Sequence, residues 1–171
     1  MKFELGRTVE LLRQTPYTLS RMLEGLSPEW TQGAGDIEDW APYDIIGHLI
    51  HGEETDWMPR AEIILAQGAN RSFEPYDRTA QFKKPKGAPL TALLTEFAHI
   101  RNANIERLVA WELQPEHFEL SGTHPASVKS RSHNSSRRGR FPTLRIFNRS
   151  FAIWRLSIRM RLVPGKNTYR F

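Results

Sequence analysis

The sequence predicts an all-α protein, an up-down helical bundle in which three helices are clear and the fourth is disrupted or absent. Apolar residues recur every three or four positions in three long segments before residue 114. The chain has 171 residues, of which 39% are hydrophobic. This is enough for one core and too short for two ordinary domains. After about residue 125 the helical pattern stops.

The first predicted helix, or kinked pair of helices, spans Phe3 to about Leu26. Pro16 lies within it. Because proline lacks an amide donor and crowds the preceding turn, we expect a kink or a division there. A polar connection containing Pro28 and Gly33 follows. The apolar residues that carry the pattern are Leu5, Val9, Leu12, Tyr17, Leu19, Met22 and Leu26.

The second predicted helix begins at residues 40–44. Pro42 suits the first helical position, and Asp44 is favourable near the positive end of the helix dipole. Pro59 is expected to kink this helix without ending it, because apolar residues continue at helical spacing up to Gly68. The stretch from 69 to 88 is rich in Lys, Pro and Gly and is predicted to be a loop.

The third predicted helix opens at Pro89 and runs to about Leu113. Its amphipathic pattern is the clearest in the chain. Three such helices would leave an apolar groove facing water, so the bundle requires a fourth helix. The residues of this apolar stripe are Leu90, Leu93, Leu94, Phe97, Ile100, Ile105, Leu108 and Trp111.

The remaining chain does not resemble a fourth helix. Residues 1–127 contain 12 Lys and Arg against 19 Asp and Glu, a net charge of −7. Residues 128–171 contain 12 Lys and Arg and no acid, a net charge of +12. Ser127–Gly139 has almost no apolar residue and would be disordered alone. Trp154–Val163 alternates basic and apolar residues with the period of a strand. We therefore expect two parts, a bundle in 1–125 and a basic, irregular, poorly ordered tail in 126–171.

His48 and His51 lie one turn apart in the second predicted helix. His48 shares a side with Ile45 and Leu49 and is expected to face the bundle interior, with open space beside it at Gly52. A neutral imidazole is a good metal ligand, but a metal site needs at least three protein groups. Spacing alone favours a hydrogen-bonded core histidine for His48 and a solvated helix face for His51.

Other catalytic signatures are missing from the sequence. It has no P-loop, no GxGxxG, no GxSxG, no HExxH and no HxxxH. It has no cysteine, which excludes a thiol nucleophile and a thiolate zinc site. Catalytic residues therefore remain unknown at this stage.

Residues 40–60, WAPYDIIGHLIHGEETDWMPR, resemble the DinB-like superfamily of four-helix bundles. The similarity lies in the tryptophan–proline helix start, the HL dipeptide and the acids that follow. It extends through HIRNANIERL in the third helix and covers about residues 1–125. The resemblance implies a divalent metal, often zinc or nickel, held by three histidines. It also implies a metal-dependent hydrolase or a thiol-dependent transferase or isomerase.

His48 matches the family's metal ligand from the second helix. The other two ligands come from an HxxxH pair on the family's fourth helix, and no such pair follows Glu119 here. The resemblance thus implies an incomplete metal site that this chain does not hold tightly, since a lone imidazole competes poorly with water. Whether the chain is an enzyme stays open.

We hypothesise that the last 44 residues are a frameshifted version of an ordinary fourth helix. The genetic code permits GEVTLxQLLATW when Ser127–Gly139 is read with the frame moved by two bases. The junction of Arg145 and Ile146 permits histidine, whereas Phe141–Pro142 permits only serine or proline. One shift therefore explains the acid-free composition and restores one candidate ligand.

The expected partners follow from these features. We expect a cytoplasmic protein, because there is no signal-peptide pattern and no run of about 18 apolar residues. Its small-molecule substrate is unknown. No membrane partner is expected, and the exposed apolar groove favours a homodimer. The alternative is a non-enzymatic module whose ten tail arginines bind nucleic acid or anionic surfaces, with strong salt dependence. A shifted frame explains the same arginines without nucleic acid.

Overall fold

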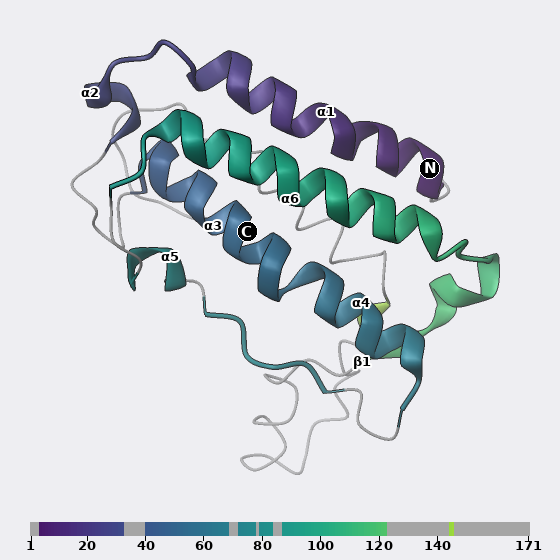
Figure 1. The fold of residues 1–171 in the computed structure, drawn as a ribbon. Coiled ribbons are helices and arrows are strands. Elements are labelled where there is room, and N and C mark those ends of the chain that lie inside the picture. Colours follow the sequence, from purple (N-terminus) through teal and green to yellow (C-terminus); the bar gives the residue numbers. More distant parts are fainter. Residues whose placement is uncertain are drawn as a thin grey trace, which may run out of the picture.

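Three long helical rods dominate the computed structural model, which describes residues 4–32, 40–68, 72–77, 79–83, 87–122 and 144–145. The first rod is α1, the second is α3 followed by α4, and the third is α6, which packs against both α1 and α3 (Figure 1). The predicted all-α bundle is therefore confirmed. The helices are α1 (Leu5–Leu23), α2 (Pro28–Thr31), α3 (Pro42–Thr55), α4 (Trp57–Ala66), α5 (Ala80–Lys83), α6 (Leu90–Ala110) and the 3₁₀ helix η1 (Pro115–Glu119).

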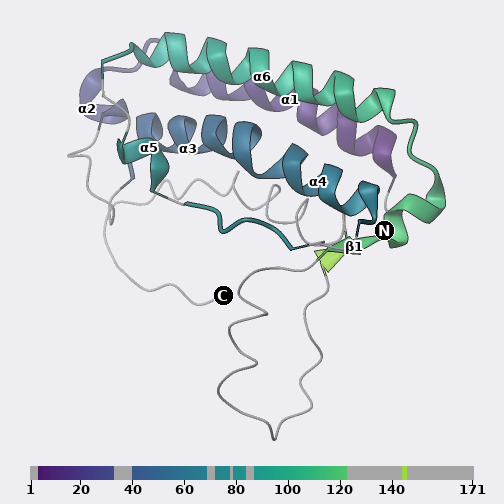
Figure 2. The ribbon, with the colours of Figure 1, turned by 60° about the horizontal axis from the view of Figure 1, so that its bottom comes forward.

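The directions of the helices add a feature that the sequence pattern does not show. α1 runs antiparallel to the other two rods, whereas α3–α4 and α6 run in the same direction (Figures 1 and 2). The chain must therefore travel back along α3–α4 before α6 begins. Residues 72–77 and α5 make part of this return, since Phe73 lies near Ile64 of α4 and Gln81 lies near Gly47 of α3.

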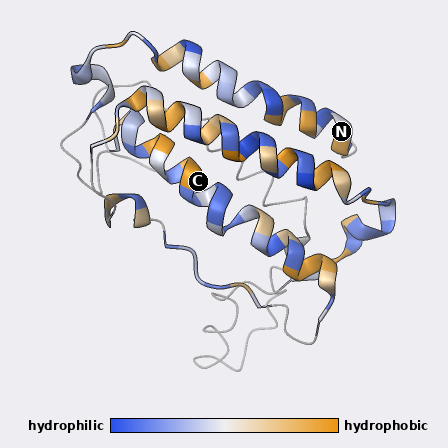
Figure 3. Ribbon diagram, in the orientation of Figure 1, coloured by the Kyte–Doolittle hydropathy of each residue, from blue (hydrophilic) through white to orange (hydrophobic). Residues whose placement is uncertain are grey.

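The core consists of two clusters, one at each end of the rods. One cluster joins the start of α1 to α4 and the end of α6, and the other joins the end of α1 to α3 and the start of α6. Polar and apolar residues alternate along each rod (Figure 3), as expected for amphipathic helices. The buried residues are Val9, Leu12, Ile64, Phe73, Ile105 and Leu108 in the first cluster, and Leu19, Leu23, Ile46, Ile50, Leu93, Leu94 and Phe97 in the second.

The start of α3 and its junction with α4 follow from local sequence. Pro42 occupies the first turn, and the Asp44 carboxylate accepts a hydrogen bond from the Ala41 amide at 3.1 Å. The helix is interrupted at Asp56, with φ −114° and ψ −65°. Pro59 explains this position, because it cannot donate to the Thr55 carbonyl and its ring crowds that group. The predicted kink is thus a break just before the proline.

Three other expectations are corrected. Pro16 does not divide the helix, since α1 is continuous from Leu5 to Leu23 with Pro16 buried inside it. The polar connection after α1 contains the single-turn helix α2, which begins at Pro28. The predicted loop before Pro89 contains another single turn, α5.

A two-residue ribbon joins the bundle to a later part of the chain. β1 (Ser121–Gly122) pairs antiparallel with β2 (Leu144–Arg145), with Gly122 opposite Leu144. This pairing crosses the boundary that the sequence suggests near residue 125. Gly122 also lies against the core, because a Cβ atom there would lie 2.4 Å from Cζ of Phe73 and 3.0 Å from Cγ1 of Ile64.

We expect Gly122→Ala to lower the free energy of unfolding by about 1–3 kcal/mol, the usual cost of overpacking a core. Gly6→Ala is the matched control, since no atom lies within 4 Å of a Cβ at that exposed helical position. The control should be neutral or slightly stabilising. Urea unfolding followed by circular dichroism measures both, and equal effects of the two substitutions would contradict the close packing of Phe73 on Gly122.

Several predictions fall outside the described residues. The fourth helix, the poorly ordered tail in 126–171 and the strand pattern of Trp154–Val163 lie there, apart from the backbone of β2. The two-part division and the frameshift stay predictions. Among the described residues, no helix has the length and hydropathy needed to cross a membrane.

Candidate functional site

His48 lies on the face of α3 that points away from α1 and α6. Successive helical residues are rotated by about 100°, so His48 lies nearly opposite the buried Ile46, Ile50 and Glu53. The sequence predicts that His48 faces the interior between the helices. With respect to α1 and α6, the other two described rods, His48 faces outward instead. His48 is nevertheless half-buried, because residues 72–77 and 79–83 of the returning segment lie along this face.

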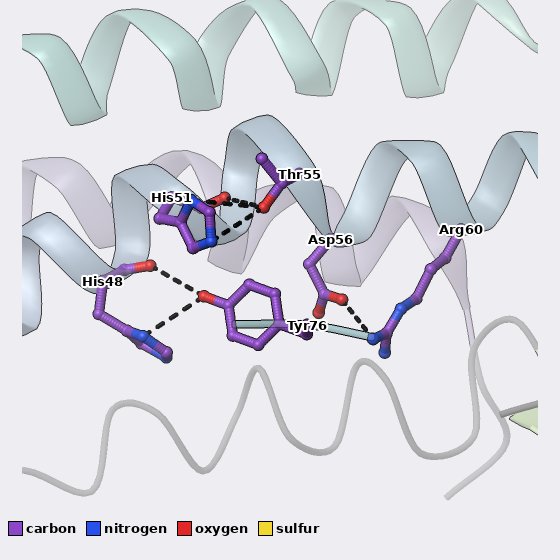
Figure 4. A network of polar contacts seen from close by, with 6 residues as sticks. All are labelled: His48, His51, Thr55, Asp56, Arg60 and Tyr76. Atoms are coloured by element: carbon purple, nitrogen blue, oxygen red, sulfur yellow. Dashed lines mark hydrogen bonds and ion pairs between the residues drawn. The ribbon is translucent and has the colours of Figure 1, made fainter. Parts of the chain in front are cut away.

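Tyr76 holds His48 through its hydroxyl group (Figure 4). The Tyr76 Oη atom lies 3.3 Å from Nδ1 of His48 and 3.4 Å from the backbone carbonyl oxygen of the same residue. Both of these contacts join the hydroxyl to His48. The contact joins α3 to a segment 28 residues further along the chain.

Aromatic rings surround the imidazole of His48 on two sides. The Trp40 ring lies 4.9 Å from it and the Tyr76 ring 5.5 Å from it, both edge to face. Phe82 of α5 packs against Trp40 at 5.7 Å. His51 stacks on Tyr76 at 5.1 Å with an interplanar angle of 26°. The ring of His48 is thus held between Trp40, which precedes α3, and Tyr76 of the returning segment.

The expectations for His51 and Gly52 are each changed by this packing. His51 contacts the Thr55 hydroxyl at 3.3 Å, as a helix face would allow, but it is half-buried by Tyr76. The space beside Gly52 is not open. A Cβ atom there would lie 3.1 Å from Nε1 of Trp57 and 3.6 Å from Oη of Tyr76. Gly52 therefore lets the Trp57 indole approach α3 closely.

Gln81 brings an unusual polar group to the same face. Both the nitrogen and the oxygen of its side-chain amide are buried, and neither has a hydrogen-bond partner among the described residues. Its Cβ lies 3.3 Å from the position of a Cβ on Gly47, one residue before His48. A buried amide without partners is costly. A water molecule or a polar ligand atom that reached this amide would therefore be stabilised.

The acids that follow His48 have other partners. Glu53 lies on the opposite side of α3, where its Oε1 atom is 2.8 Å from Nη2 of Arg101 and its Oε2 atom accepts from Asn104 at 3.0 Å. Asp56 pairs with Arg60 at 2.7 Å. Burial lowers the pKa of Arg101 below its usual value, while the charge of Glu53 opposes that shift. Glu53 thus serves the packing of α3 on α6, whereas Asp56 and Arg60 lie on the same side as His48 and Tyr76 (Figure 4).

The donor set of the described residues does not by itself fit a metal ion. No three or more side chains among His, Asp and Glu converge in the part of the chain that the structure describes. His48 contributes one nitrogen, and its neighbours are an aromatic hydroxyl and an indole ring. Completing a site at His48 would require ligands from elsewhere, such as the fourth helix that the resemblance implies.

The sequence analysis missed Tyr76 and Gln81. Both lie in a segment without periodicity, so no pattern connects them to His48. Trp40 and Trp57 are half-buried next to His48 and Gly52, whereas Trp30 is 70% exposed.

The fold is a helical bundle, of which the structure describes three long rods. No protein-family model matches the chain, and no curated protein matches it. Among solved structures, the chain is similar to YfiT from Bacillus subtilis, described as a probable metal-dependent hydrolase with an unusual four-helix bundle topology. The TM-score is 0.59 and the identity 17%, over 71% of this chain and 69% of YfiT. At this identity the similarity establishes the fold.

Proposed function

We propose that this chain is a DinB-like bundle protein whose ancestral type is a divalent-metal-dependent enzyme, and that its metal site is incomplete. His48 is the ligand that α3 contributes. The reaction class is metal-dependent hydrolysis, with thiol-dependent transfer as the other reaction implied by the resemblance. The ion of the ancestral type is zinc or nickel.

The position of His48 is the observation that carries this proposal. The imidazole is half-buried, packed between Trp40 and Tyr76, and bonded through Nδ1. Metal-binding histidines are commonly held in this way, with one ring nitrogen hydrogen-bonded and the other directed to the ion. The similarity of the fold to YfiT, described as metal-dependent, and the resemblance of residues 40–60 support the same class.

The carboxylates of Glu53 and Asp56, which follow His48 on the chain, already have other partners. Glu53 is bound to Arg101 and Asn104, and Asp56 is bound to Arg60. A single neutral imidazole does not retain a divalent ion against water. The frameshift hypothesis supplies a reason for one missing ligand, because the junction of Arg145 and Ile146 permits histidine in a reading frame that this chain does not use.

Elemental analysis of the full chain after dialysis tests the proposal. We expect far less than one zinc or nickel ion per chain in the wild type and in His48→Ala. His99→Ala is the matched control, because His99 is an exposed histidine of α6. About one ion per chain in the wild type and the control, lost in His48→Ala, would show that other groups complete the site. That result would overturn the proposed incompleteness.

The alternative of an arginine-rich module falls on residues 128–171, outside the described residues except for the backbone of β2. Homodimer formation and the small-molecule substrate also stay predictions.

A further inference from the structure

We propose that α5 is a cover over the His48 face that opens while the long helices stay folded, and that the buried amide of Gln81 makes this opening easy. The inference rests on the proposed function only for the importance of access to His48. The opening itself is a property of the metal-free chain and can be measured without a ligand.

The single turn α5 lies beside the start of α3 (Figure 1). It meets α3 through the stem of Gln81, whose Cβ lies 3.3 Å from the position of a Cβ on Gly47. The chain enters the turn at Asp77, whose carboxylate accepts hydrogen bonds from the Thr79 amide at 2.9 Å and from the Thr79 hydroxyl at 2.8 Å. These contacts define the closed position of α5.

The side-chain amide of Gln81 works against this closed position. Its nitrogen and its oxygen are both buried, and neither has a hydrogen-bond partner among the described residues. In the open position both atoms would reach water, so the amide favours opening relative to an apolar side chain of the same length. A single turn also has few backbone hydrogen bonds to break. We therefore expect α5 to open far more often than the long helices.

The contacts of Phe82 connect this opening to His48. The Phe82 ring packs on Trp40 at 5.7 Å, and the Trp40 ring packs on the His48 imidazole at 4.9 Å. Withdrawal of α5 takes Phe82 away from Trp40 and uncovers α3 at Gly47, one residue before His48. Trp40 then has room to move off the imidazole. The closed turn thus restricts the access of small molecules to His48, and the open turn permits it.

Native-state hydrogen exchange of the full, metal-free chain tests the opening. The reporter is the Phe82 amide, which donates to the Thr79 carbonyl at 3.0 Å. Corrected for intrinsic rates, it should exchange about 100-fold faster than the amide of Phe97 in the middle of α6. Gln81→Met keeps the length of the side chain without its amide and should slow exchange at Phe82 about tenfold. Gln81→Glu puts a charge at the same place and should accelerate this exchange.

The same two substitutions at Gln14 are the matched controls, because Gln14 is exposed on α1. They should leave exchange at Phe82 unchanged. Modification of histidines by diethyl pyrocarbonate, followed by peptide mass spectrometry, tests the access to His48. Relative to the exposed His99 of the same chain, His48 should react more slowly in Gln81→Met and faster in Gln81→Glu.

Three results would overturn the inference. The first is a wild-type Phe82 amide that exchanges as slowly as the Phe97 amide, a result that needs no variant. The second is wild-type exchange at Phe82 in folded Gln81→Met and Gln81→Glu chains. The third is a reactivity of His48 that does not follow the exchange at Phe82. Metal content distinguishes this inference from the proposed function: stoichiometric, His48-dependent metal would overturn the incomplete site and leave the opening of α5 intact.

Discussion

Replacing Arg101 by methionine should lower the free energy of unfolding by about 3–5 kcal/mol, the usual cost of leaving one member of a buried ion pair unpaired. Arg101 and Glu53 are each 3% exposed at the side chain, and two guanidinium nitrogens lie 2.8 and 2.9 Å from the same carboxylate oxygen. Without Arg101, the side-chain amide of Asn104 is the hydrogen-bond donor that remains to the Glu53 carboxylate among the described side chains. This pair joins α3 to α6, so its loss destabilises the central packing of the bundle.

Arg107→Met is the matched control. Arg107 pairs with Glu62 between α6 and α4, but the two side chains are 53% and 48% exposed. Exposed pairs contribute about 0–1 kcal/mol. The double variant Glu53→Met with Arg101→Met should recover part of the loss, because it buries no unpaired charge. Urea unfolding measures all three. Equal effects of Arg101→Met and Arg107→Met would contradict the burial of the Glu53–Arg101 pair.

Phe97→Ala should cost about 3–5 kcal/mol of unfolding free energy, the range for removing a buried phenylalanine. Phe97 is 0% exposed and packs with Ile46, Ile50 and Leu94 where α3 and α6 meet. The Arg101 guanidinium also lies over its ring, 4.7 Å from the centroid. The substitution thus removes a core side chain and a cation–π contact together.

Phe118→Ala makes the same chemical change at a half-buried position at the edge of the other cluster. It should cost clearly less, because less apolar surface is returned to water. Since Phe97 and Arg101 touch, the effects of Phe97→Ala and Arg101→Met should not add in a double variant. Equal losses for the two phenylalanines, in the same urea experiment, would contradict the assignment of Phe97 to the core.

The helices could be predicted because their signals are local. The start of α3 follows from Pro42 and Asp44, and the break at Asp56 follows from Pro59.

The buried position of Arg101 can also be predicted from the sequence. The apolar stripe of α6 continues through Phe97, Ile105 and Leu108, and Arg101 occupies the gap within it. A charge in such a stripe requires an opposite charge, and Glu53 follows Ile46 and Ile50 on the buried side of α3 in the same way.

The arrangement around His48 could be predicted only in part. The motif in residues 40–60 singles out His48, and helical spacing groups it with Ile45 and Leu49, but that side of α3 faces away from the described rods α1 and α6. The side is decided by what packs against the helix, and the segment of residues 72–83 has no periodicity that would reveal its path. The contacts of Tyr76 with His48 span 28 residues and follow from that path.

The metal-to-chain ratio of the dialysed full chain tests the central claim most directly, with His48→Ala measured beside it. The account predicts a ratio far below one for zinc and nickel in both chains, because no group of three or more metal-ligating side chains converges among the residues that the structure describes. A ratio near one that falls in His48→Ala would contradict it, and would show that residues outside the described part of the chain complete a metal site on His48.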